Sequence, residues 1–145
     1  MRREESSIYI GLKRIRKAIR VALFSMNKTD RHFYGAEIIE AMNETFKHFV
    51  LAFEFKDERM HHMHGMIAWF AVLRDTLDFV SGEGLLHFHK RTPKPKKDKD
   101  GNEIPQNPVE EIPTAKMELF KLIAQVDADI TKWVASQRKG STMVD

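Results

Sequence analysis

The 145-residue sequence contains no cysteine. This absence excludes a disulfide framework and thiolate zinc sites, and it fits a reducing compartment. Long apolar runs are also lacking: none approaches the roughly 20 residues that span a bilayer, so we expect no membrane partner. The N-terminal residues lead into an amphipathic segment without a separate apolar core. We therefore expect no signal peptide and a cytoplasmic location.

Proline is lacking from most of the chain, because all five prolines lie between residues 93 and 113. Proline opposes helix formation through its fixed φ and its missing N–H donor. The surrounding stretch, 83–113, holds a lysine-rich half at 90–101 and is neutral overall, with six basic and six acidic residues. We predict a long, mobile, Pro/Lys-rich loop over 83–113.

Outside this stretch, apolar residues recur at spacings of three and four, the period of an amphipathic helix. The pattern predicts helices over about 5–26, 30–55, 57–81 and 114–138, and Asp30 is the expected N-cap of the second. Short turns between long helices favour antiparallel neighbours. We therefore predict a single all-α domain over 1–145, an up-down-up-down four-helix bundle with a long loop between helices three and four. Its expected core stripes are Ile8, Leu12, Ile15, Ile19 and Leu23; Ile38, Met42, Phe46, Phe49 and Phe53; Met63, Ile67, Phe70, Leu73, Leu77 and Val80; and Met117, Phe120, Ile123, Val126, Ile130 and Trp133.

Charge is unevenly distributed although the net charge is only +3. Residues 1–26 hold seven Lys/Arg and two Asp/Glu, a net of +5, whereas residues 27–55 hold three and five, a net of −2. Such asymmetry favours a basic working surface and also attraction between copies of the protein. A solvated face that serves solubility is the alternative.

The basic residues of the first helix recur at helical spacing, which suits the neutralisation of nucleic-acid phosphates. Residues outside the core stripe of the second helix (Ile39, Val50 and Leu51) suggest an apolar seam that a partner subunit covers. The predicted nucleic-acid-binding residues are Lys13, Arg14, Arg16, Lys17, Arg20, Arg31, Arg138 and Lys139.

The sequence shows no complete catalytic constellation. It has no nucleophile elbow and no phosphate-binding glycine loop. Glu58 and His61 form one E-x-x-H pair, but di-iron bundles need a second pair and further glutamates, and no second copy exists. We therefore expect no enzyme, no catalytic residue, no cofactor and no metal site. A di-iron or other metal-binding bundle is the remaining alternative, and it would require stoichiometric metal.

A family resemblance lies in several segments taken together. The joint at 26–38 reads MNKTDRHFYGAEI, residues 71–77 read AVLRDTL, and matching pieces follow at 123–126, 130–134 and 138–140. These segments resemble the accessory variability determinant (Avd) proteins of diversity-generating retroelements. They are similar also to the bundle proteins encoded by rRNA intervening sequences.

The resemblance implies a four-helix bundle that assembles as a homopentamer with a basic surface. It implies an accessory protein, without catalysis of its own, that binds the element's reverse transcriptase and its template RNA, or the cDNA, and supports mutagenic reverse transcription. Arg74 would contact the partner. The family pattern has a second basic residue one turn later, where this sequence has Asp78, and its connection is shorter than 83–113. The alternative is an intervening-sequence-type bundle that acts as a protein-interaction scaffold.

Overall fold

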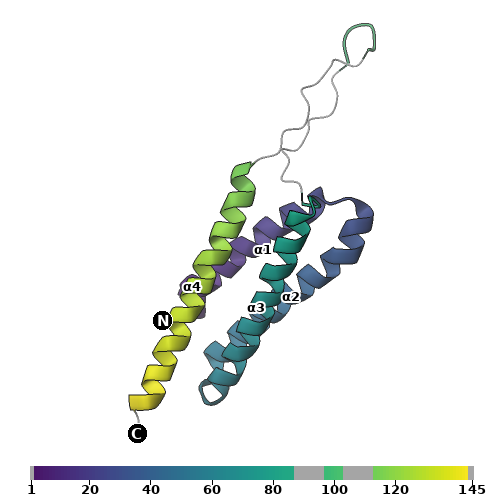
Figure 1. Ribbon diagram of the computed structural model, residues 1–145. Coiled ribbons are helices and arrows are strands. Elements are labelled where there is room, and N and C mark those ends of the chain that lie inside the picture. Colours follow the sequence, from purple (N-terminus) through teal and green to yellow (C-terminus); the bar gives the residue numbers. More distant parts are fainter. Residues whose placement is uncertain (1, 87–96, 103–112, 144–145) are drawn as a thin grey trace.

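The chain folds into four long helices that run up, down, up and down (Figure 1). The computed structural model describes residues 2–86, 97–102 and 113–143, without the side chains of 113–115 and 139–143. The helices are α1 (Ser7–Ser25), α2 (Lys28–Glu54), α3 (Arg59–Gly82) and α4 (Pro113–Met143), with 3₁₀ turns at Arg3–Glu5 and Lys56–Glu58. The predicted all-α four-helix bundle is confirmed. Most of the predicted loop, residues 87–96 and 103–112, lies outside the described residues.

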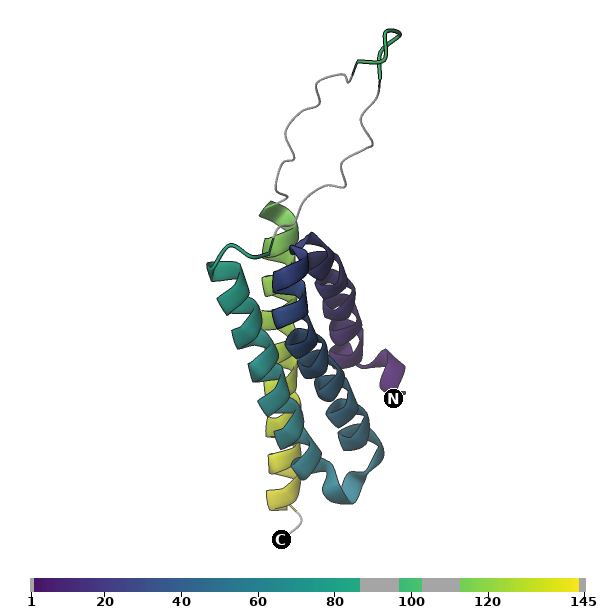
Figure 2. The same ribbon diagram turned by 90° about the vertical axis from the view of Figure 1, so that its right-hand side faces the viewer.

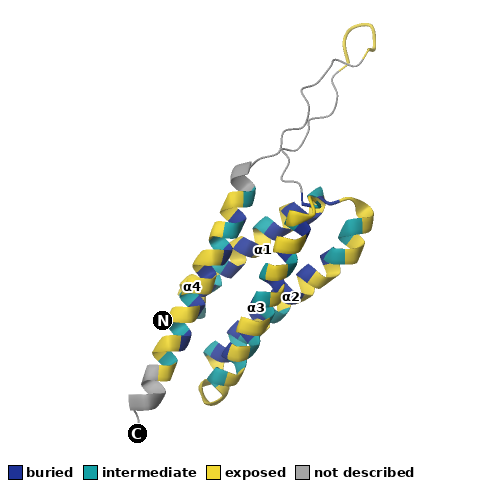
Figure 3. Ribbon diagram, in the orientation of Figure 1, coloured by how far each residue is buried: buried dark blue, intermediate teal, exposed yellow. Residues whose placement is uncertain are grey.

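The bundle consists of two closely packed pairs, α2 with α3 and α1 with α4. Figure 2 shows the teal α3 beside the blue α2, and Figure 3 shows buried residues as stripes along the helices. The predicted stripe of α1 is buried throughout. Nearly all the other predicted core positions are also buried or half-buried. Helical periodicity therefore identified the inner faces.

The core prediction is wrong for two residues. Ile67 and Met117 are exposed, and the neighbouring Met66 and Leu119 occupy the core instead. At about 100° per residue, Leu119 lies on the Val126 side of α4, whereas Met117 lies on the opposite side. Met117 therefore satisfied the apolar pattern near the start of α4 without facing the partner helices.

The helix ends differ from the predicted ones. α2 starts at Lys28 because Asn27 is its N-cap: Asn27 Oδ1 accepts a hydrogen bond from the Asp30 N–H at 2.9 Å. The prediction of Asp30 as the cap is wrong, and Asp30 lies in the first turn. α3 begins at Arg59 after a 3₁₀ turn rather than at 57, and α4 continues to Met143 rather than ending at 138.

Arg59 closes the end of α2. Its Nε donates to the Ala52 carbonyl at 2.8 Å, and its guanidinium also donates to the Phe53 carbonyl and to Gln137 Oε1, each at 3.3 Å. The last carbonyls of a helix lack partners within the helix, so this side chain satisfies two of them. The same contact ties the α2–α3 connection to α4.

A second tie joins the start of the chain to the end of α2. Arg3 donates to Glu54 Oε1 at 3.1 Å, and both side chains are partly exposed. At their opposite ends, α1 and α2 are joined directly through residues 26 and 27. The two helices are therefore connected at both ends.

Among the described residues, no helix is long and apolar enough to span a bilayer.

Candidate functional site

The outer side of α1 carries the largest group of predicted binding residues. Burial of its core stripe leaves five basic side chains exposed. Two of them are held over aromatic rings: the Arg16 guanidinium lies 4.0 Å from the Phe46 ring centroid, and Lys13 Nζ lies 5.6 Å from that of Tyr9. Such positioning lowers the conformational entropy lost when an anion binds. The exposed basic residues are Lys13, Arg14, Arg16, Lys17 and Arg20.

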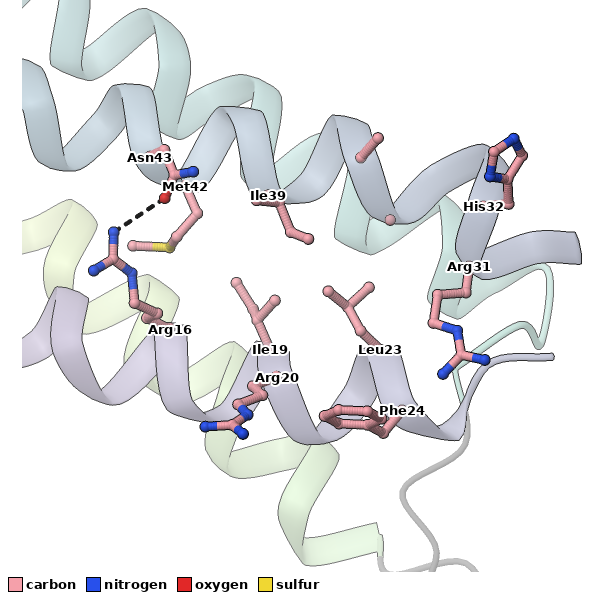
Figure 4. A pocket seen from close by; sticks show the side chains of 12 residues that line it. Arg16, Ile19, Arg20, Leu23, Phe24, Arg31, His32, Ile39, Met42 and Asn43 are labelled. Atoms are coloured by element: carbon pink, nitrogen blue, oxygen red, sulfur yellow. Dashed lines mark hydrogen bonds between the residues drawn. The ribbon is translucent and has the colours of Figure 1, made fainter. Parts of the chain in front are cut away.

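A groove of about 560 Å³ runs between α1 and α2. Its floor is apolar, and Figure 4 shows Ile19 and Leu23 of α1 pointing toward Ile39 of α2. Gly35, Ala36 and Met42 complete the floor. Ile19 and Leu23 are buried beneath the walls, whereas Ile39 is 48% exposed. The groove therefore presents aliphatic surface to solvent.

Polar side chains stand at the edges and ends of this groove. Arg16 lies at one end, where it donates to Asn43 Oδ1 at 3.1 Å, and Arg31 and His32 lie at the other (Figure 4). Arg20 stands on the α1 edge beside Phe24 (Figure 4). Three of the predicted binding residues, two from α1 and one from α2, are thus brought together by the fold.

The remaining predicted residues do not line this groove. Arg14 faces α4 beside Glu118, and Arg138 lines a different groove, between α3 and α4. Arg74 is engaged in ion pairs with Asp75 at 3.4 Å and with Asp127 of α4 at 3.8 Å. The side chain of Lys139 lies outside the described residues. The described members of the predicted set therefore do not share one surface.

Sequence reasoning missed several lining residues, of which Phe24 is the most prominent. Its side chain is 68% exposed at the groove edge. A signal was present, because Phe24, Val21 and Ile10 are apolar residues that fall outside the core stripe of α1. His32 and Asn43 carried no such signal, since polar residues on a helix are ordinarily solvated.

A histidine pair lies between α2 and α3. The ring centroids of His48 and His62 are 6.0 Å apart, and each Nε2 faces a carboxylate four residues earlier: Glu44 of α2 at 3.7 Å and Glu58 of the 3₁₀ turn before α3 at 3.4 Å. Glu58 thus pairs with His62 rather than with His61, the partner in the E-x-x-H motif. Among the described residues, no three His, Asp or Glu side chains are grouped as a metal site would require.

Burial is the main influence on His48. It lowers the pKa of His48 below the ordinary value, Glu44 opposes this change, and His62, Lys47 and His61 add to it. His48 Nδ1 is buried with no hydrogen-bond partner on the described part of the chain. A proton on this ring would therefore be poorly solvated, so burial favours the neutral form of His48.

Comparison of the chain with protein-family models, with curated proteins and with solved structures found no match.

Proposed function

We propose that this protein is a non-enzymatic accessory factor that binds RNA through the basic outer face of α1. The observation that carries the proposal is the exposure of five basic side chains on one helix, with a sixth, Arg31 of α2, lining the same groove as Arg16 and Arg20. Cations in such an array displace the counterions condensed on nucleic-acid phosphates. Binding of this kind depends weakly on sequence and steeply on salt.

The finer proposal is an accessory protein of a diversity-generating retroelement that binds the reverse transcriptase and its template RNA. Its support is the sequence resemblance at 26–38, at 71–77 and in the last helix. Homo-oligomerisation, to a pentamer by that resemblance, would repeat the α1 face, so that modest contacts per subunit add up to high avidity. Arg74 would contact the transcriptase by exchanging its ion pair with Asp127 for one with the partner.

The test is charge reversal on the outer face of α1. The variant Lys13→Glu, Arg14→Glu, Lys17→Glu changes three exposed residues, and it leaves Arg16 in its contacts with Phe46 and Asn43. We expect the affinity for a structured RNA, measured by fluorescence anisotropy, to fall by at least about tenfold. The slope of log affinity against log salt should fall by roughly 2–3, since each lost phosphate contact accounts for about 0.7–0.9.

A matched control reverses three exposed lysines elsewhere, Lys47→Glu, Lys56→Glu and Lys132→Glu, with the same change in net charge. Its RNA affinity should stay much closer to that of the wild-type protein. Circular dichroism establishes that both variants remain helical. Equal losses in the two variants would mean that net charge alone governs binding and would contradict a defined α1 surface.

An interaction scaffold is the second candidate function. The observation in its favour is exposed apolar surface, for example Phe24, Phe33 and Phe79, each more than half exposed. Such side chains suit a protein partner better than a phosphate backbone. Absence of RNA binding by the wild-type chain at low salt would replace the RNA proposal with this one.

A further inference from the structure

The α1–α2 groove combines an apolar floor with uncompensated positive charge. None of its twelve lining residues is acidic. Within the described part of the chain, Arg16, Arg20 and Arg31 form no ion pair. Guanidinium groups beside a low-dielectric surface interact more strongly with carboxylates than the same groups do in open water. The groove therefore favours an occupant that is apolar along its centre and acidic at its edges.

The dimensions of the groove suit a helix. The α1 wall extends from Arg16 to Phe24, which at 1.5 Å per residue is about 12 Å, or slightly more than two helical turns. An amphipathic helix places apolar anchors at i, i+3 or i+4, and i+7 over nearly that length. The walls are themselves two helices, so an added helix would complete a three-helix contact.

A nucleotide suits the groove less well. Its floor consists of Ile19, Leu23, Gly35, Ala36, Ile39 and Met42, whose side chains offer no hydrogen-bonding group to a base edge. A buried base would lose its hydrogen bonds to water without replacement, and this loss disfavours its binding. A carbon-rich helix face has no such requirement.

We propose that this groove binds an amphipathic helix of a partner protein, one with an apolar stripe flanked by glutamate or aspartate. This binding site shares Arg16, Arg20 and Arg31 with the proposed RNA-binding set, whereas Lys13, Arg14 and Lys17 do not line it. The apolar stripe of the partner contacts Ile39, Phe24 and the floor. Its acidic flanks pair with Arg20 on the α1 edge and with Arg31 at the α2 end.

The test uses a designed helical peptide as the probe and the full chain as the receptor. The peptide has about 15 residues, enough for a marginal helix, with leucines at i, i+3, i+4 and i+7 and glutamates on both flanks. A second peptide replaces each glutamate with lysine. We expect the glutamate peptide to bind with a micromolar Kd by anisotropy and the lysine peptide at least about tenfold more weakly. The changes in backbone amide chemical shift that the peptide causes, measured by NMR, should be concentrated at residues 16–24 and 31–43.

Two pairs of variants make the experiment specific. Ile39→Asp places a charge in the groove at a side chain that is already 48% exposed, and Val21→Asp does the same at a 57% exposed position of α1 that does not line it. The first should weaken peptide binding at least about tenfold and the second hardly at all. Arg20→Glu with Arg31→Glu should reverse the preference toward the lysine peptide, a gain that an unfolded variant could not show.

Several results would overturn the proposal. One is equal binding of both peptides by the wild-type chain, and another is equal effects of Ile39→Asp and Val21→Asp. If Ile39→Asp instead dissociates an oligomer that the glutamate peptide cannot displace, the occupant is a second copy of this chain. If it abolishes RNA binding while the wild type ignores the peptide, the occupant is nucleic acid. The Lys13, Arg14, Lys17 variant should retain peptide binding, which separates failure here from failure of the RNA proposal.

Discussion

Gly11 is the residue on which the contact between α1 and α4 depends most directly. A methyl group at this position would overlap Cγ2 of Val126, which is buried. Packed interiors do not yield readily to an added methyl group. The close approach of the two helices therefore requires the absence of a side chain at Gly11.

We expect Gly11→Ala to destabilise the fold. Alanine ordinarily stabilises a helix by about 1 kcal/mol relative to glycine, but overpacking costs roughly 1–3 kcal/mol and should outweigh it here. Gly82→Ala is the control, since a methyl group there would meet nothing within 4 Å. Urea unfolding measures all of these free energies. The double variant Gly11→Ala, Val126→Ala should be more stable than the sum of the single changes predicts, and simple additivity would contradict the contact.

The contact between α2 and α3 is predicted to weaken in acid. Because burial lowers the pKa of His48 in the folded protein, the unfolded chain binds a proton first as the pH falls below the ordinary value of 6.5. Stability is therefore full above this value and declines with falling pH until the folded pKa is passed. Unfolding free energies between about pH 5 and 8 measure the decline.

The variant His48→Gln should reduce this pH dependence. His64→Gln is the control, because His64 is an exposed histidine on α3. The readout is the slope of stability against pH rather than stability itself, since glutamine also changes the packing against Gly65. An unchanged slope in His48→Gln would show that other groups titrate.

At the scale of elements, the sequence predicted the helices and their inner faces because burial imposes a 3.6-residue period on them. It misplaced the start of α2 because Asn27 and Asp30 are both good capping residues, and only the geometry decides between them. Arg59 was not foreseen as the residue that closes α2. Its role depends on a turn that returns its side chain to carbonyls six and seven residues earlier.

The candidate site was predictable in part. The exposed basic side chains of α1 follow from its core stripe, so Lys13 and Lys17 could be identified from spacing alone. The packing of α1 against α2 brings Arg16, Arg20 and Arg31 to one apolar groove. The apolar pattern of a single helix carries no information about this packing. Arg138, another predicted nucleic-acid-binding residue, lines a different groove, between α3 and α4, and a single helix pattern could not show this separation.

The whole molecule is electrically asymmetric, with a net charge of +5 over residues 1–26 and −2 over 27–55. Salt screens the attraction between oppositely charged faces of two copies. It does not screen the hydrophobic stabilisation that comes from burying exposed apolar side chains such as Phe55 and Phe79. We therefore predict self-association that weakens, without disappearing, between about 0.05 and 0.5 M salt. Sedimentation velocity measures it, and a monomer at every salt concentration would contradict the proposed homo-oligomer.

The Arg3–Glu54 ion pair has a mechanical consequence for the whole bundle. Because α1 and α2 are joined at both ends, the two helices can move apart in the middle, but neither end can separate freely. The groove lies within that span. One connection is covalent and the other is a partly exposed ion pair, which salt weakens. At high ionic strength α1 and α2 are held firmly only at the chain connection through residues 26 and 27. We therefore expect the groove to admit thicker occupants than it does at low ionic strength.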